Sequence, residues 1–480
     1  MAAFSFLWHD YETFGVVPRR DRPAQFAALR TDADLNPIDE PQCWYCRPAS
    51  DFLPDPQACL LTGITPQHCL AQGLPEAEFA AAIEQQLTRP GTIGVGYNSM
   101  RFDAEVTRFL FWRNLIDAYA HEWRDDCGRW DLLDVLRCAF ALRPDGIAWP
   151  QHDDGTPSFR LEDFSRANGL AHEAAHDALA DVRATIALAR CVKRANPKLW
   201  AFCLELRRKA QVQQQIDAAR AQGQPLLHVS GRYPAARGCL ALVWPLAPHP
   251  SNRNEVIVWD LATDPAELAR LDAAAVRERL FTRSDELPAG VTRLPLKTIH
   301  LNRAPIVIAN LKTLPAAMAA RWGLDVDQAR RCAEAAARLD PQLSGLWPAV
   351  FARPQREQPA DVDEDLYGGF LGDADRQRLA RLRRLAPAEL ARSRQRFSDA
   401  RLEELVWRYR ARNFPETLAP AEQAKWRRHC AARLNDAADG RLTLAAYRER
   451  LAALATDADD RTRALLAELG AYADAIAVAG

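Results

Sequence analysis

Residues 4–15, FSFLWHDYETFG, decide the fold because two acids follow a short apolar run. Phe4–Trp8 is predicted to form a buried strand. Side chains at alternate positions of an extended chain share a face, so Asp10 and Glu12 are expected to project together. Neighbouring carboxylates repel each other unless a cation lies between them, and hard divalent ions such as Mg²⁺ prefer oxygen ligands. The pattern alone is more typical of an exposed strand end with two solvated acids than of a metal site.

Two later segments add residues that suit the same site. Asp103 stands at the start of a predicted helix that follows the buried-strand candidate TIGVGY at 92–97. His176 and Asp181 bracket the start of another predicted helix. Positions i and i+5 of one helix point about 140° apart, so these side chains converge only if Asp177 is the N-cap and the histidine precedes the helix. Each residue alone is more typical of an ordinary surface group.

The chain of 480 residues is long enough for two to four domains, and its texture changes along its length. Residues 1–196 alternate strand-like and helix-like runs, which predicts an α/β domain. Residues 197–352 mix short β-like runs such as EVIVWDL with helical patches, which predicts a small α+β domain with a barrel-like sheet. Residues 353–480 open with a polar linker, RPQREQPADVDED at 353–365, and continue as a predicted all-α domain.

Composition excludes several classes of protein. With 48% hydrophobic and 26% charged residues, the chain is typical of a globular protein, and no run approaches the ~20 apolar residues of a membrane helix. The N-terminus has no basic signal-peptide segment, and irregularly spaced cysteines predict reduced thiols in the cytoplasm. Residues 1–200 hold 20 Lys and Arg against 28 Asp and Glu, whereas residues 201–480 hold 42 against 35. This asymmetry suits a metal-binding part beside polyanion-binding parts, although chance explains it equally well.

Taken in order, D-x-E, then D, then H-x4-D resembles the histidine-containing branch of the DEDD exonuclease superfamily, whose fold is ribonuclease H-like. A closer resemblance, to the bacterial exonuclease I family of single-strand-specific 3′→5′ deoxyribonucleases, rests on eight motifs. They are HDYETFG, DRPAQFAA, LTGITPQ, GYNSMRFDAEVTR, RWDLLDV, PSFRLE, AHDALADVRATIALA and YRARNFP. The resemblance is dense over residues 5–195, thinner over 200–350 and returns at 360–420. It implies an exonuclease domain, an SH3-like barrel domain and a C-terminal helical domain.

The resemblance also implies a mechanism. Asp10, Glu12, Asp103 and Asp181 are expected to hold two Mg²⁺ ions, for which Mn²⁺ substitutes, and His176 is expected to be the general base. The expected reaction is hydrolysis of single-stranded DNA from a free 3′ end to 5′-mononucleotides, in repair and recombination. The rival interpretations are a 3′→5′ exoribonuclease of the same superfamily and a non-catalytic DNA-binding scaffold.

Further residues are expected to contact the DNA strand. Thr62, Gly63 and Ile64 are expected to meet the 3′-terminal nucleotide beside Glu12, although a simple turn after a strand explains the bare sequence equally well. Arg160 is a candidate phosphate clamp because a guanidinium offers a bidentate fork. Cations and rings suited to phosphate contact and base stacking are Arg108, Tyr119, Trp123, Arg137 and Phe202. Each ring taken alone is more typical of a core residue.

The family resemblance implies a protein partner, the acidic, Phe-ended C-terminal tail of single-stranded DNA-binding protein. Such a tail requires a cation for its carboxylate beside an apolar pocket for its ring. Arg143 matches the expected position, and Phe202 is a second candidate for the pocket, which competes with its assignment to DNA. An ordinary helix-end cation explains Arg143 nearly as well. No membrane partner is expected, and the protein is expected to be a monomer.

Overall fold

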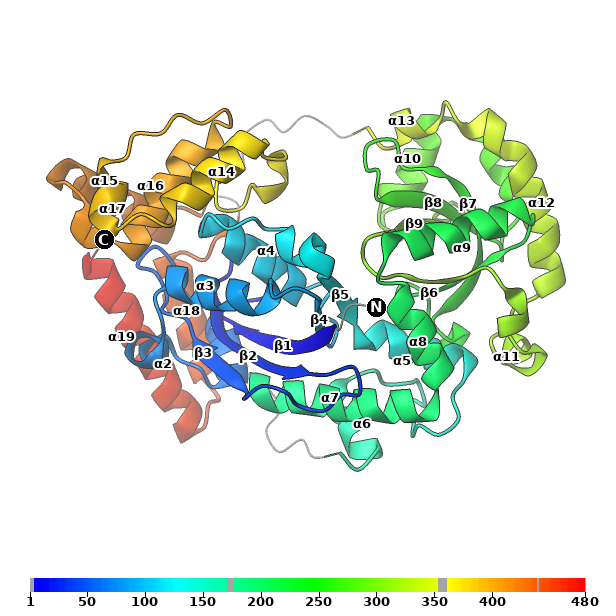
Figure 1. Ribbon diagram of the computed structural model, residues 1–480, viewed down its shortest axis with the longest axis horizontal. Helices are drawn as coiled ribbons and strands as arrows, with labels where there is room; N and C mark the ends of the chain where they lie inside the picture. Colours follow the sequence, from blue (N-terminus) through cyan, green and yellow to red (C-terminus); the bar gives the residue numbers. More distant parts are fainter. Residues whose placement is uncertain (1–3, 171–176, 353–360, 438–439, 480) are drawn as a thin grey trace. The chain divides into compact units, whose positions relative to one another are not determined.

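The computed structural model describes residues 4–170, 177–352, 361–437 and 440–479, which form two compact units (Figure 1). The first unit joins residues 1–128, 172–183 and 358–480, and the second joins residues 129–171 and 184–357. The first part of the chain therefore shares a unit with the C-terminal helices, although nearly half of the sequence separates the two segments. Within the described residues, no helix is both long and apolar enough to span a membrane.

The first unit is built on a mixed β-sheet. Its strands are β1 (Ser5–Thr13), β2 (Pro23–Thr31), β3 (Gln42–Tyr45) and β4 (Thr92–Gly96), and β5 (Gly128–Asp131) begins at the last residue of this segment. β1 pairs antiparallel with β2 and parallel with β4, and β3 pairs antiparallel with β2. The predicted α/β character of this part of the chain is confirmed.

Strand β1 extends farther than the sequence pattern indicates. The predicted strand ends at Trp8, whereas β1 continues to Thr13 because β2 supplies pairing partners from Phe6 to Thr13. Asp10 lies opposite Ala27, and Glu12 lies opposite Gln25, with an irregularity in register immediately afterwards. The two acids therefore lie inside a paired strand rather than at its free end, which fixes their backbone far better than a strand terminus would.

Helices from both ends of the sequence complete the first unit. From the N-terminal part come α1 (Pro56–Thr62), α2 (Pro66–Gln72), α3 (Glu76–Leu87), α4 (Asp103–Arg113), η1 (Ala120–Glu122) and η2 (Arg124–Asp126). From the C-terminal part come η6 (Leu366–Gly368), α14 (Asp373–Leu382), α15 (Pro387–Arg392), α16 (Arg401–Asn413), η7 (Pro415–Thr417), α17 (Pro420–Asn435), α18 (Leu444–Ala455) and α19 (Asp460–Ala479). The described part of residues 353–480 is helical, as predicted.

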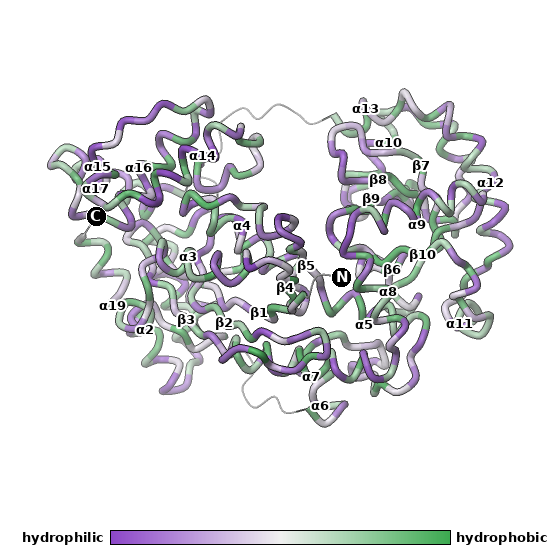
Figure 2. The backbone as a smooth tube through the Cα atoms, in the orientation of Figure 1, coloured by the Kyte–Doolittle hydropathy of each residue, from purple (hydrophilic) through white to green (hydrophobic). Residues whose placement is uncertain are grey.

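The C-terminal helices pack directly on the α/β part. One apolar cluster joins Leu7 and Phe79 to Leu402 and Leu405 of α16, and a second joins Phe14 to helices α18 and α19. Hydrophobic and hydrophilic residues alternate along these helices in Figure 2, as expected for helices that bury one face. Burial of shared apolar surface, rather than a chain connection alone, therefore joins the two segments.

A buried ion-pair network reinforces this packing and corrects the predicted linker. Asp361 and Asp363 belong to the polar stretch interpreted as a linker, but Asp363 is only 1% exposed. It lies within ion-pair distance of Arg412 from α16 and Arg22 from the α/β part. Neighbouring arginines hold the pKa of Asp363 well below its ordinary value. The last residues of the stretch are thus structural, while 353–360 lie outside the described residues.

The second unit is α+β. Its antiparallel sheet has the order β10-β6-β7-β8-β9. The strands are β6 (Leu226–Val229), β7 (Leu240–Pro248), β8 (Glu255–Asp260), β9 (Leu296–His300) and β10 (Ile306–Ile308). The helices are α5 (Leu132–Leu142), α6 (Leu161–Ala167), most of α7 (Ala178–Ala195), α8 (Pro197–Glu205), α9 (Lys209–Ala221), η3 (Ala235–Arg237), η4 (Pro265–Arg270), α10 (Ala273–Phe281), η5 (Leu311–Thr313), α11 (Ala316–Arg321), α12 (Val326–Leu343) and α13 (Trp347–Val350).

A buried histidine makes the stability of the second unit depend on pH. His228 on β6 is 5% exposed, its Nδ1 lies 3.0 Å from the Tyr233 hydroxyl, and desolvation with nearby Lys297 and Arg232 lowers its pKa from 6.5 to about 3. Below pH 6.5 the His228 imidazole is protonated in the unfolded chain but stays neutral in the folded chain. The stabilisation is therefore complete above pH 6.5 and declines by about 1.4 kcal/mol per pH unit on acidification towards pH 3.

We expect His228→Gln to flatten this decline. Free energies of unfolding from guanidinium titrations at several values between pH 6.5 and 4.5 measure the slope. Parallel curves for the variant and the parent protein would contradict the buried, neutral state of His228.

Candidate active site

Three carboxylates from two elements converge in the first unit. Asp10 and Glu12 come from β1, and Asp181 comes from the first turn of α7. One carboxylate oxygen of each lies within 4.8 Å of the others. The shared face of Asp10 and Glu12 follows from strand alternation, as predicted. This donor set consists only of hard oxygen ligands, so it fits a divalent cation such as Mg²⁺ or Mn²⁺.

Asp103 joins this group from the N-terminus of α4. Its Oδ1 accepts a hydrogen bond from the backbone N–H of Tyr11, the residue between the two strand acids, at 3.2 Å. The side chain is only 4% exposed. This backbone contact holds the Asp103 carboxylate beside the strand, and its charge acts on both Asp10 and Glu12.

The acids raise one another's pKa because they are buried together. Desolvation raises the pKa of Asp10 well above its ordinary value, and the charges of Asp103, Glu12 and Asp181 raise it further. Desolvation, followed by Asp181 and Asp103, raises the pKa of Glu12 to about 8. Concentrated negative charge of this kind is costly without a counter-charge. Such strongly shifted acids are typical of functional sites, and a divalent cation would relieve the repulsion.

The start of α7 has the geometry that the sequence requires. The helix begins at Ala178, and the Asp177 side chain accepts a hydrogen bond from the Ala180 N–H at 2.9 Å. Asp177 is therefore the N-cap, as predicted, and Asp181 lies inside the first turn. His176, the predicted general base, lies outside the described residues, so its role stays a prediction.

The Thr62–Gly63–Ile64 segment is a turn between two helices. Gly63 ends α1 with a left-handed φ of 71°, and Thr65 caps α2. The alternative of a turn after a strand does not hold, because a helix precedes the glycine. Ile64 is 8% exposed and packs in an apolar cluster with the C-terminal helices, whereas Gly63 is exposed. Contact between these residues and a nucleotide stays a prediction.

Arg108 has a different environment from the one expected of a phosphate contact. It is 4% exposed, and its guanidinium donates to both Glu122 oxygens, at 2.6 and 2.9 Å, and to Glu105 at 2.9 Å. It also lies over the Tyr119 ring, 5.2 Å from the centroid. Its cationic charge is satisfied inside the protein, which the sequence pattern did not reveal. Arg108 therefore supports Tyr119 rather than presenting a free guanidinium at the surface.

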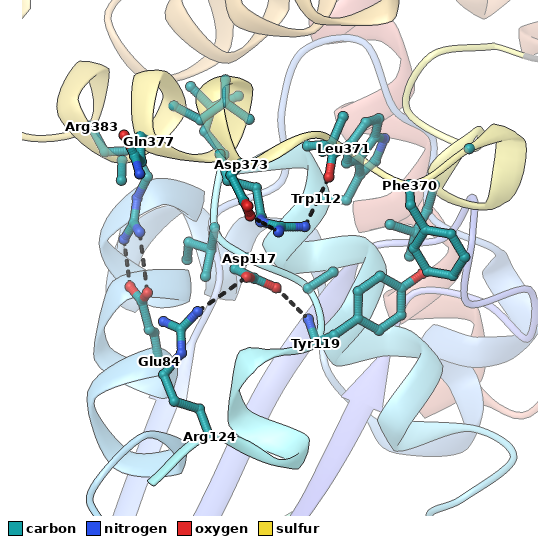
Figure 3. A pocket seen from close by; sticks show the side chains of 18 of the residues that line it. Glu84, Trp112, Asp117, Tyr119, Arg124, Phe370, Leu371, Asp373, Gln377 and Arg383 are labelled. Atoms are coloured by element: carbon teal, nitrogen blue, oxygen red, sulfur yellow. Dashed lines mark hydrogen bonds and ion pairs between the residues drawn. The ribbon is translucent and has the colours of Figure 1, made fainter. Parts of the chain in front are cut away.

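Phe370 and the half-buried Tyr119 line a cavity of about 580 Å³ in the first unit. Figure 3 shows the Tyr119 ring beside Phe370, and their centroids are 6.1 Å apart. Phe370 is 88% exposed and Trp123 is 64% exposed. Sequence reasoning selected Tyr119 and Trp123 but missed Phe370, because only folding brings the loop before α14 next to η1. In the sequence LYGGFLG, nothing indicates that Phe370 contacts a ligand.

The second unit holds the other predicted contact residues. Arg137 pairs with Asp134 at 2.7 Å and lies over the Phe159 ring, while the Arg160 side chain is exposed. Arg143 and Phe202 line one cavity of about 410 Å³, whose walls are completed by residues such as Cys138, Leu142, Lys198 and Ile308. The exposed Arg143 donates from Nη1 to the Thr313 carbonyl at 3.0 Å.

Comparisons with protein-family models identify the class of protein to which this chain belongs. Three family models match: Exonuclease over residues 7–189, Exonuclease I SH3-like domain over 207–353, and Exonuclease I C-terminal domain over 360–476. The predicted fold class, a ribonuclease H-like exonuclease domain with SH3-like and helical domains, is confirmed. The acids of β1 and α7 thus belong to a hydrolytic nuclease.

Individual relatives then show to which family of nucleases the chain belongs. Exodeoxyribonuclease I of Escherichia coli (strain K12) is 48% identical over 428 residues, which covers 88% of this chain and 89% of that protein. The zinc-bound crystal structure of an E. coli ExoI–ssDNA complex superposes with a TM-score of 0.92 at 44% identity, over 99% of this chain and 100% of that one. An ExoI/SSB-Ct complex gives 0.90 at 44% identity, over 99% of each chain. This chain belongs to the exodeoxyribonuclease I family, which confirms the resemblance in the sequence.

Proposed function

We propose that this protein degrades single-stranded DNA from a free 3′ end to 5′-mononucleotides with two divalent ions, in DNA repair and recombination. Mg²⁺ is the proposed ion, and Mn²⁺ substitutes for it. The observation that carries the proposal is the convergence of Asp10, Glu12 and Asp181, with Asp103 beside them. The DNA and zinc in the similar solved structure support it. We also propose a cytoplasmic monomer with domains at 1–196, 197–352 and 353–480.

The residues of the site have separate roles in the proposed hydrolysis. When bound, divalent ions lower the pKa of water and stabilise the attacking and leaving oxygens of a phosphodiester. Asp10, Glu12 and Asp181 would hold these ions, and Asp103 adds a fourth carboxylate at the site. His176 takes the proton from the attacking water, which requires a neutral imidazole. The backbone N–H of Tyr11 keeps the Asp103 carboxylate beside the strand.

Exposed rings in the first unit supply a surface for unpaired bases. Trp123 and Phe370 present exposed π-faces that any base can stack on without sequence preference, and the half-buried Tyr119 ring lies beside Phe370. The exposed Arg160 suits a phosphate. Thr62, Gly63 and Ile64 are proposed to meet the terminal nucleotide, and Arg137 and Phe202 remain proposed contacts farther along the strand.

A gel assay with labelled nucleic acids tests the function. We expect linear single-stranded DNA to shorten from its 3′ end in Mg²⁺ and to remain intact in EDTA, while blunt duplex and closed single-stranded circles resist. Binding is expected to weaken steeply with salt because phosphate contacts release counterions. Digestion of the circle would reveal an endonuclease, preferential digestion of RNA an exoribonuclease, and binding without cleavage a scaffold. Any of these outcomes would overturn the proposal.

The cavity at Arg143 is the proposed docking site for the C-terminal tail of single-stranded DNA-binding protein. An exposed guanidinium stands beside an apolar wall containing Leu142, Phe202 and Ile308, which suits a carboxylate beside an aromatic ring. The similar structure with an SSB-Ct ligand supports this assignment.

We expect Arg143→Ala to weaken binding of a tail peptide by about tenfold, because it removes a charge-assisted hydrogen bond. Fluorescence anisotropy with a labelled peptide measures the affinity. Arg166→Ala is the matched control, since its side chain is 80% exposed on the same unit and does not line the cavity. Equal affinities for the Arg143 variant and the parent protein would remove Arg143 from the site.

A further inference from the structure

A buried amide links the strand acids to the helix that carries Asp181. Gln25 lies on β2 directly opposite Glu12 and is only 2% exposed. Its Oε1 accepts a hydrogen bond from the backbone N–H of Ala178, the first residue of α7, at 3.5 Å. The side chain therefore spans from the strand pair to the N-terminus of the helix.

The orientation of this amide is set from its other end. Gln25 Nε2 donates to the Tyr45 hydroxyl at 3.3 Å and to Cys43 Sγ at 3.2 Å, both on β3. An amide nitrogen donates and an amide oxygen accepts, so these two acceptors direct the oxygen towards Ala178. The β3 contacts thus select the rotamer that reaches α7.

The Ala178 N–H is one of the helix N–H groups that has no partner within α7 itself. Ala178 is fully buried, which makes an unpaired N–H at this position costly. Asp177 caps the N–H of Ala180, so the cap serves a different donor of the same turn. Gln25 therefore supplies the partner that the cap does not provide.

Asp181 stands three residues after Ala178, and residues three apart lie on the same helical face. A shift of the first turn consequently displaces the Asp181 carboxylate relative to Asp10 and Glu12. We propose that Gln25 is a positioning residue for the metal site, which holds the start of α7 so that Asp181 completes the carboxylate group. This inference rests on the proposed function, because it assumes that these acids hold divalent ions.

The test measures Mn²⁺ binding to the full-length, metal-free protein without DNA, by isothermal titration calorimetry. We expect Gln25→Leu to weaken Mn²⁺ binding by about tenfold or more, the usual effect of removing a residue that orients metal ligands. The Mn²⁺ concentration for half-maximal cleavage should rise by the same factor, while KM for DNA stays near the parent value. Gln42→Leu is the matched control, because this glutamine lies on the neighbouring strand β3 and its amide donates to the Glu40 carbonyl at 3.0 Å.

Gln25→Asn is the second variant, should the leucine variant fail to fold. It keeps the amide and nearly all of the volume but is one methylene too short to reach Ala178. Parent-like Mn²⁺ affinity in either folded variant would overturn the inference. Asp181→Asn, measured in parallel, separates the two claims. Loss of binding there with unchanged Gln25 variants removes only the positioning role, whereas unchanged binding in Asp181→Asn removes the metal site itself.

Discussion

Asp10→Ala is expected to slow hydrolysis of single-stranded DNA by at least ~10³-fold while the protein stays folded. Asp10 stands at the centre of the acid group, where Asp103, Glu12 and Asp181 all act on its pKa. Removing it takes away a metal ligand, yet it also relieves repulsion between buried acids, so stability should not fall. Single-turnover cleavage in saturating Mg²⁺ measures the rate, and thermal unfolding checks the fold.

Asp34→Ala is the control for this variant, because Asp34 is an exposed acid in the turn between β2 and β3. Its cleavage rate should equal that of the parent protein. DNA binding by the Asp10 variant should persist in part, since the exposed rings and cations are untouched. Near-parent cleavage by Asp10→Ala would refute the assignment of the site.

The second large effect is expected from Asp363→Ala, which should lower the free energy of unfolding by about 3–5 kcal/mol. Asp363 is 1% exposed and lies near four arginine side chains, and its Oδ1 accepts from Arg412 Nη1 at 3.1 Å. Its removal takes one counter-charge away from a buried cluster of guanidinium groups, which keeps Asp51 and Asp361 as partners. Those groups come from both the α/β part and the C-terminal helices, so the packing of one on the other should weaken.

Guanidinium titration measures the loss of stability. Asp460→Ala is the matched control, because Asp460 is 99% exposed and pairs with Arg463 only at the surface. That variant should change stability by less than about 0.5 kcal/mol. A similarly small effect of Asp363→Ala would show that the buried network contributes little to holding the C-terminal helices.

Local sequence patterns were sufficient to predict how the acids of the site are placed. Strand alternation placed Asp10 and Glu12 on one face, and a capping rule placed Asp181 inside the first turn of α7. Both inferences depend on residues within a few positions of each other. The length of β1 was underestimated because its last residues are held by pairing with β2, which a pattern confined to one strand does not contain.

Contacts between distant segments were the part that the sequence did not reveal. Arg108 is a residue type that commonly contacts phosphate, but its guanidinium forms ion pairs with Glu122 and Glu105. Asp363 lies in a stretch that looks like a linker until arginines from other parts of the chain surround it. Phe370 acquires a role only beside Tyr119. In each case the deciding partner is supplied by the fold.

The most direct test of the account is a crystal structure of the protein soaked in Mn²⁺, with anomalous diffraction used to locate the ions. We expect anomalous peaks coordinated by Asp10, Glu12 and Asp181, with oxygen ligands at roughly 2.0–2.2 Å, and we expect these peaks to be absent in Asp181→Asn. Peaks elsewhere, or none at a Mn²⁺ concentration that supports full activity, would contradict the claim that these carboxylates hold the catalytic metal.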